Sequence, residues 1–449
     1  MDEAVPGIYI LVLMALHGDA IRDLSVRVKP RGRRLPRTRR SRADELLDEA
    51  ACHLNARGVS QTSLNDIADR LGVSRAALYY YVDDREDLVF KVYRRSLEIL
   101  ARHLGEAARS GREALAVVDA FISSTLDPGE PEIAALAEIG LLRGPERETV
   151  LALYEGVVAR LASVLETGVR AGQIRPCDCD IAARCVISII HWVPLSGRWN
   201  PVDRIEREPL IRFICEFVRL GVATPRAPIE RPADVDVSQL AAPAIASLDQ
   251  GTVRQAKREA ILLTASRLFN IKGIDTTSLD EIAAALGTNK RALYRNLGDK
   301  QAIVTACYER AFRIAFQISD VVGSLGLSAA AELDLQQRAH ALVQQNRDIS
   351  PLRQLSGLDA LSSEGRAYVI EAARQFADIA RGRVLQAQQD GEMRPLDVGG
   401  FLLLAASPSA WLVKPLTEAS AQRQADIANS IADFVRLGLA SLPASRISP

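Results

Sequence analysis

The sequence has 449 residues and few of the residues that mark several common protein classes. Six cysteines are too few for a disulfide framework, and their context is intracellular. Aromatic residues make up only 5%, and the five histidines follow no partner pattern. No Walker loop, Rossmann glycine pattern, metalloprotease His-Glu-x-x-His or Gly-x-Ser-x-Gly elbow occurs. These absences predict a protein that is not an enzyme and that has no cofactor.

Long apolar runs are also missing. No run approaches the ~18–20 residues of a membrane span. The longest run near the start, Ile8–Leu16, follows Asp2 and Glu3 instead of a basic leader. This pattern argues against a secretory signal and predicts a cytoplasmic protein without membrane contact.

The formal net charge is zero, but the charge is unevenly distributed. The window 27–102 carries +6, because a basic arm, Arg27–Arg42, has nine Lys or Arg residues and no acid. The window 254–317 carries +5, and the rest of the chain therefore carries −11. Two positive islands in an acidic remainder suggest two surfaces for a polyanion. Solvated charged faces of this size also arise by chance, so charge alone does not decide.

The chain repeats itself at a shift of 215 residues. Over positions 44–88 and 259–303, 15 of 45 residues are identical. Phe-Val-Arg-Leu-Gly at 217–221 recurs at 434–438, and Arg-Pro at 175–176 recurs at 394–395. The preserved order indicates that a whole unit was duplicated, which differs from a solenoid of short repeats.

A proline-rich stretch with little periodicity separates the two units and is interpreted as a linker. The predicted domains are an N-terminal extension and basic arm at 1–42, a first head at 43–102, a first body at 103–223, the linker at 224–254, a second head at 255–317 and a second body at 318–443.

Each head has the pattern of a helix-turn-helix. A helix of 3.6-residue period ends at Gly58 or Gly273. A short helix capped by threonine or serine follows, then a turn containing glycine, and then a third helix predicted at Arg75–Tyr81 or Lys290–Asn296. A longer fourth helix is predicted to start near an aspartate.

The run from Thr62 to Leu88 resembles the DNA-binding region of the tetracycline-repressor (TetR) family, and the run from Thr277 to Ile303 shows the same pattern. The resemblance implies an all-α chain of two TetR-like units, each with a three-helix head and a helical ligand-binding and dimerisation body. It also implies a regulator that binds double-stranded DNA in the bacterial nucleoid, usually a repressor released by a small molecule. The family usually dimerises between separate chains, whereas here two units share one chain.

The third helix would enter the major groove, and helix N-termini and basic residues would hold phosphates. In the family a tyrosine at the position of Tyr79 typically holds a phosphate, and Arg85 matches a lysine. Tyr81 and Asn296 replace a frequent histidine. Tyr79 alone could instead fill the core, and the basic arm is as readily a solvated tail as a minor-groove contact. The DNA-contact candidates are Thr62, Ser63, Ser74, Arg75, Ala76, Tyr79, Tyr80, Tyr81 and Arg85 in the first head, and Thr277, Ser278, Asn289, Lys290, Arg291, Tyr294, Arg295, Asn296 and Lys300 in the second.

The two reading helices differ, with Ser-Arg-Ala at 74–76 against Asn-Lys-Arg at 289–291. We therefore expect an operator with unlike halves. In an alternative, only one head, the second more readily than the first, binds DNA and the other unit serves for dimerisation.

In the family, the last two helices of each body form a four-helix bundle with their counterparts. The candidates are about 178–195 with 203–222, and 396–413 with 420–441. The sequence allows an intrachain pseudo-dimer or a homodimer with four heads.

The effector is not identified by the sequence, although the Ala/Leu/Val-rich middle of each body is consistent with an apolar pocket. Trp192 and Trp411 are candidates to line it, with core packing as the favoured alternative. Cys177, Cys179 and Cys185 near His191 match no standard zinc spacing, so no metal site is predicted.

Overall fold

The computed structural model describes residues 41–59, 62–136, 138–196, 206–224, 236–240, 249–353, 361–413 and 420–441. Within these ranges the regular structure is helical, apart from two isolated β-bridges, which confirms the all-α class. The basic arm up to residue 40 and most of the proposed linker lie outside the described residues. The last residues assigned to the linker belong to a helix, because Asp249 caps a helix that starts at Gln250.

The first unit follows the predicted order. Its head and body consist of α1 (Arg42–Arg57), α2 (Leu64–Leu71), α3 (Arg75–Leu78), α4 (Arg85–Arg109), α5 (Ala114–Leu126), the 3-10 turn η2 (Ile139–Leu141), α6 (Gly144–Arg170), α7 (Cys179–Ser196) and α8 (Arg207–Leu220).

The second unit repeats this order, after a short 3-10 turn, η3 (Val237–Leu240). It consists of α9 (Gln250–Lys272), α10 (Leu279–Ala285), α11 (Lys290–Leu297), α12 (Lys300–Gly323), α13 (Ala329–Gln345), α14 (Ser363–Gln389), α15 (Val398–Leu404), the 3-10 helix η5 (Ser407–Val413) and α16 (Ala421–Leu437).

The helix predicted at about 396–413 is divided into α15 and η5. Pro408 has no N–H to donate to the carbonyl of Leu404, four residues earlier. The Ser407 hydroxyl donates to that carbonyl instead, at 2.6 Å. The division is therefore a local consequence of one proline and one serine.

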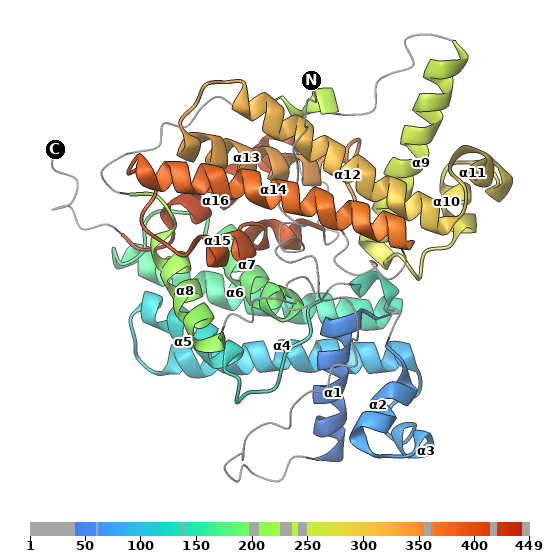
Figure 1. The fold of residues 1–449 in the computed structure, drawn as a ribbon. Helices are drawn as coiled ribbons and strands as arrows, with labels where there is room; N and C mark the ends of the chain where they lie inside the picture. Colours follow the sequence, from blue (N-terminus) through green and yellow to red (C-terminus); the bar gives the residue numbers. More distant parts are fainter. Residues whose placement is uncertain are drawn as a thin grey trace.

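The two units lie against each other in one chain. Figure 1 shows α4, α5 and α6 on one side, α12, α13 and α14 on the other, and α7, α8, α15 and α16 between them. Helix α7 packs against η5 and α16, and α8 packs against α16. The apolar residues of this middle layer, including Ile214, Phe217, Ile431 and Phe434, are buried.

The repeated Phe-Val-Arg-Leu-Gly sequence lies at the junction of the units. Gly221 and Gly438 cross closely, so that a Cβ on either would lie 2.5 Å from the backbone nitrogen of the other. Both have left-handed φ values, +60° and +63°, which glycine tolerates best. Arg175 Nε donates to Gly438 O and Arg394 Nε donates to Gly221 O, each at 2.7 Å. The contact is thus reciprocal, as in a two-fold dimer interface.

Candidate nucleic-acid interface

The second helix of each head begins at a serine. Ser63 Oγ accepts a hydrogen bond from the backbone of Asn65, and Ser278 Oγ accepts one from the backbone of Glu281, each at 3.1 Å. Glu281 also accepts from the Ser278 N–H at 2.8 Å, which completes a capping box. Ser63 is half-buried and Ser278 is exposed.

The two neighbouring threonines are buried. Thr62 and Thr277 are 3% and 0% exposed. Their hydroxyls donate to the carbonyls of Gly58 and Gly273, at 2.6 and 2.8 Å, and so hold the loop after the first helix. This geometry removes both side chains from the set that we propose for DNA contact.

The third helices differ in length. Ser74 caps α3 and Asn289 caps α11, each accepting from a backbone N–H three residues later. However, α3 ends at Leu78 and not at Tyr81 as predicted, and the three consecutive tyrosines continue it as a turn. Aromatic residues lose side-chain freedom in a helix, which weakens this end. Helix α11 has eight residues and ends where Gly298 bonds to Tyr294 O.

The first head exposes most of its predicted contacts. Ser74, Arg75 and Ala76 are exposed, as is Arg85. Tyr79 is 41% exposed and Tyr80 85%, so neither fills the core. Arg75 Nη2 donates to the Tyr79 hydroxyl at 3.0 Å, and these two side chains form one polar group at the surface.

Tyr81 differs from its two neighbours. Its side chain is half-buried against the core and makes an edge contact with the Tyr80 ring. Leu78, predicted to be buried, is 1% exposed.

The second head exposes Asn289, Lys290, Arg291 and Arg295, and Tyr294 is 50% exposed. Lys290 Nζ lies 3.1 Å from the Asp280 carboxylate, which raises the pKa of Lys290.

Two further candidates of the second head are partly buried and engaged. Asn296 Nδ2 donates to Ala292 O at 2.6 Å. Lys300 Nζ donates to Asp275 O at 3.0 Å, and burial lowers the pKa of Lys300. Each side chain keeps at least one further N–H donor, so a phosphate could be bound without breaking the present bond.

The heads lie far apart at one side of the molecule. In the view of Figure 1, α2 and α3 are at the lower right and α10 and α11 at the upper right. Long helices, α4 and α12, connect them to the bodies.

An asparagine joins each head to its body, and the sequence reasoning missed it. Asn55 Nδ2 donates to Ile133 O at 2.8 Å, and its Oδ1 accepts from Ala135 N at 3.0 Å. Asn270 makes the same pair of bonds with Pro351 O and Arg353 N, at 2.9 and 2.8 Å. The identity of Asn55 and Asn270 in the repeat was a signal, but their partners, about 80 residues away, could not be deduced from it.

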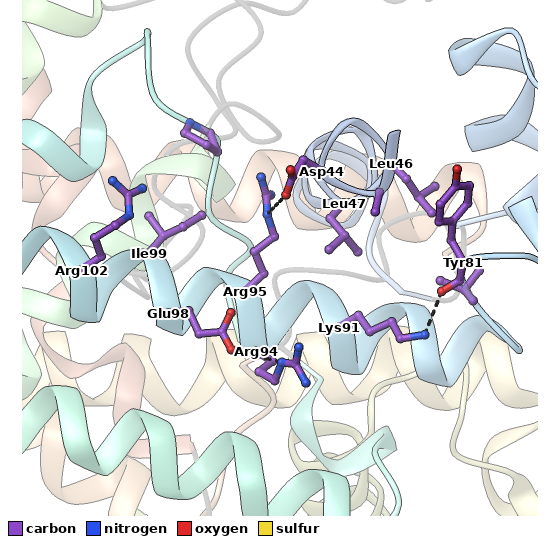
Figure 2. A pocket seen from close by; sticks show the side chains of 13 residues that line it. Asp44, Leu46, Leu47, Tyr81, Lys91, Arg94, Arg95, Glu98, Ile99 and Arg102 are labelled. Atoms are coloured by element: carbon purple, nitrogen blue, oxygen red, sulfur yellow. Dashed lines mark hydrogen bonds and ion pairs between the residues drawn. The ribbon is translucent and has the colours of Figure 1, made fainter. Parts of the chain in front are cut away.

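A groove of about 560 Å³ lies between α1 and α4 of the first unit. Figure 2 shows its apolar floor of Leu46, Leu47 and Ile99 beside several cations. Each of these cations has a carboxylate partner: Lys91 has Asp87, Arg94 has Glu98, Arg95 has Asp48 and Arg102 has Glu130. The groove therefore presents no uncompensated positive charge.

Both candidate tryptophans are buried between the units. Trp192 Nε1 donates to Leu403 O at 2.8 Å, and the Arg184 guanidinium lies 5.5 Å from the centre of the Trp411 ring. Trp192 and Trp411 are 4% and 3% exposed. This placement fits core packing at the junction.

The cysteines are placed as structural residues. Burial raises the pKa of Cys177, and it raises that of Cys179 to about 12. Among the described residues, no group of three His, Cys, Asp or Glu side chains is arranged to hold a metal ion. Nor does any described helix have the length and apolarity to cross a membrane.

Comparison with known proteins agrees with this geometry. Residues 46–92 and 261–307 both match "Bacterial regulatory proteins, tetR family", and residues 109–201 match "Tetracyclin repressor-like, C-terminal domain". The chain is 29% identical over 191 residues to the HTH-type transcriptional repressor KstR2 of Rhodococcus jostii, which covers 41% of this chain and 92% of that protein. It is 26% identical over 170 residues to the probable HTH-type transcriptional regulator ArpR of Pseudomonas putida, covering 34% and 78%.

Solved structures of similar proteins include AibR in complex with isovaleryl coenzyme A and operator DNA, at 20% identity and a TM-score of 0.34. They also include KstR2 of Mycobacterium tuberculosis, at 21% and 0.31. These two cover 39% of this chain and 97% and 91% of their own chains. Both heads and the first body thus match models of the tetR family of bacterial regulatory proteins, consistent with a tandem duplication of a TetR-like unit, and these matches support a DNA-binding regulator.

Proposed function

We propose that one chain supplies both heads to one operator and represses transcription there. The observation that carries this proposal is the repeated surface group of a tyrosine and a basic residue. Arg75 on α3 with Tyr79 directly after it, and Lys290 with Tyr294 on α11, stand exposed, while Leu78 and Leu293 beneath them are buried. The exposed tyrosine and basic side chains are available to contact DNA phosphates. The buried leucines stabilise the head.

The reciprocal junction supports an intrachain pseudo-dimer. Gly221, Gly438, Arg175 and Arg394 bind the two units to each other as equivalent surfaces bind in a dimer. A homodimer would need a second interface or an exchange of units between chains. The pseudo-dimer therefore gives two heads per chain, and we propose that this monomer is the DNA-binding form.

Unlike reading helices should select unlike half-sites. Ser74, Arg75 and Ala76 occupy the positions that Asn289, Lys290 and Arg291 occupy in the second head, and all six are exposed. Selection of bound duplexes from a random pool tests this expectation. Two different half-sites at a fixed spacing would support it, and a perfect palindrome protected equally by both heads would contradict it.

A second candidate function is favoured by the length of α3. With four helical residues against eight in α11, the first head presents a shorter regular surface to the groove. In this alternative the second head reads DNA and the first unit completes the dimer-like body.

Paired alanine variants separate the two candidates. The first pair, Arg75→Ala and Tyr79→Ala, changes the first head, and the second pair, Lys290→Ala and Tyr294→Ala, changes the second head. Fluorescence anisotropy measures the affinity of each variant for the selected duplex. If both heads bind, each pair weakens affinity by a similar factor, about 10-fold for a loss near 1.4 kcal/mol. If only the second head binds, the first pair leaves the affinity unchanged.

We propose that a small molecule bound in a body releases the DNA. Asn55 and Asn270 support a route for this effect, because each ties the end of the first head helix to the loop that precedes the long body helix. A ligand that moves this loop would reposition the head. DNA release by the ligand, measured on wild type and on the asparagine variants, tests the route.

A further inference from the structure

The body of the second unit contains an arginine with an incomplete set of partners. Arg353 follows the loop held by Asn270 and is 8% exposed. Its Nη2 donates to Ser409 O at 3.0 Å. Among the residues that the structure describes, its Nε and Nη1 have no hydrogen-bond partner. A guanidinium has five N–H donors, so most of its capacity is unused.

The charge of Arg353 is also uncompensated. No ion pair joins it to a carboxylate in the described part of the chain, and burial lowers its pKa to about 9. Other buried arginines of this unit are paired: Arg310 Nε lies 2.9 Å from Glu259, and Arg338 Nε lies 3.1 Å from Asp334. A buried charge without a partner is costly, so its presence calls for an anion that these residues do not supply.

The first unit lacks this group at the equivalent position. Ala135 N donates to Asn55 Oδ1 as Arg353 N donates to Asn270 Oδ1, so the two residues occupy the same place in the repeat. Alanine satisfies the loop geometry in the first unit. The arginine side chain is therefore an addition specific to the second unit, and the fold of the loop does not require it.

The surroundings of Arg353 suit a charged group on an otherwise apolar molecule. His340, on α13, is 7% exposed and stacks edge-on against the Phe376 ring of α14, with 6.4 Å between ring centres. Burial lowers the pKa of His340 to about 3, and the nearby Arg353 lowers it further, so the imidazole is neutral at pH 7. His340 therefore adds no positive charge beside Arg353.

We propose that the second body binds an anionic effector, a carboxylate or a phosphate monoester, whose charge pairs with Arg353. The ligand would complete the guanidinium hydrogen bonds, and its remainder would lie among apolar side chains. Ser409, the present partner, is in η5, which packs against α7 of the first unit. The consequence for DNA release rests on the proposed function, whereas anion binding itself does not.

The first test measures thermal unfolding of the full chain in buffer without the probe anions. Arg353→Met keeps the length and removes the unpaired charge, and we expect its unfolding midpoint to rise by about 2 °C. Arg338→Met is the matched control: it removes the hydrogen-bonded partner of the buried Asp334, which keeps only the longer 3.7 Å contact with Arg436, and its midpoint should fall. A fall for both variants would show that Arg353 is a structural cation and would overturn the proposal.

The second test adds ligands. Octanoate and phenyl phosphate serve as the carboxylate and phosphate probes, with octanamide and phenol as neutral counterparts, over a range up to millimolar concentration. Wild type should be stabilised by one of the two anions and by neither neutral molecule, and Arg353→Met or Arg353→Ala should lose that shift. If no anion stabilises wild type more than the variants, the proposal is wrong.

DNA affinity without any probe distinguishes failure of this proposal from failure of the proposed function. Arg353 is in the body, so wild type and Arg353→Met should bind the selected duplex equally. If the protein binds the anion but no DNA, the anion site is supported and the proposed regulator function is wrong. If it binds DNA but no anion, the regulator function is supported and the anion site is wrong.

Discussion

At the residue scale, Gly221 and Gly438 determine how closely the two units approach. Each combines a left-handed backbone with backbone neighbours that leave no room for a Cβ. The close crossing of the two backbones at the junction of the units therefore explains why glycine follows Phe-Val-Arg-Leu in both copies. The motif was visible in the sequence, but its partner was not, because nothing local indicates that each copy contacts the other.

Gly438→Ala should therefore destabilise the protein strongly. The new Cβ would lie 2.5 Å from Gly221 N, and the φ of +63° adds strain, so we expect a loss of about 2–4 kcal/mol in the free energy of unfolding. Gly391→Ala is the control, since its φ is +72° but nothing lies within 4 Å of the new Cβ. It should cost about 1 kcal/mol, and equal losses in urea unfolding would argue against the close crossing.

His340 predicts an acid-sensitive body. Its pKa is about 3 in the folded protein and near 6.5 when unfolded, because burial and then Arg353 disfavour its charged form. The unfolded chain therefore binds the proton first, and stability that is complete above about pH 6.5 declines as the pH falls toward 3.

From pH 7.5 to pH 5 this histidine alone should remove about 2 kcal/mol from the free energy of unfolding. His340→Gln should flatten the pH dependence over that range, and denaturant titrations at several pH values measure it. The same slope in wild type and variant would show that other groups are responsible.

At the element scale, the helix-turn-helix boundaries were well predicted because local chemistry defines them. Ser63, Ser278, Ser74 and Asn289 cap their helices through side-chain bonds that a sequence displays. The early end of α3 was not predicted, because the competition between helix and turn at three tyrosines depends on small free-energy differences. Thr62 and Thr277 were assigned to DNA although their hydroxyls hold a loop, since burial depends on tertiary packing.

The body was predicted less completely. Its helices were located by length and periodicity, but the polar interior of α13 was not foreseen. Asp334 and Arg338 form an ion pair with both side chains 2% exposed, and Arg353 reaches this body from a loop after α13. Whether a charged residue is buried depends on contacts between distant segments, which the pattern of one helix does not contain.

The hydrogen bonds of Asn55 and Asn270 should couple each head helix to the loop of its body. Asn270→Ala removes two hydrogen bonds to the loop at Pro351 and Arg353, and Asn55→Ala removes the matching pair in the first unit. Each variant should lose about 1–3 kcal/mol of stability, because buried backbone groups lose their partners. Faster hydrogen exchange confined to the loop and the end of the adjacent helix is expected, and no change in either place would contradict the link.

At the scale of the whole molecule, duplication allows the sequences of the two heads to diverge, while every chain still carries one copy of each head. A variant tests this directly: Ser74→Asn, Arg75→Lys, Ala76→Arg and Tyr80→Arg give the first head the reading residues of the second. Selection with this variant should return a more symmetric operator than selection with wild type. An unchanged operator would show that the first head does not read bases.

The mass of the protein–DNA complex shows whether one chain supplies both heads. We predict that light scattering of wild type with the selected operator reports one 48.9-kDa chain per duplex. Free protein should have the mass of one chain at every dilution. Two chains on each duplex would contradict a single chain that supplies both heads.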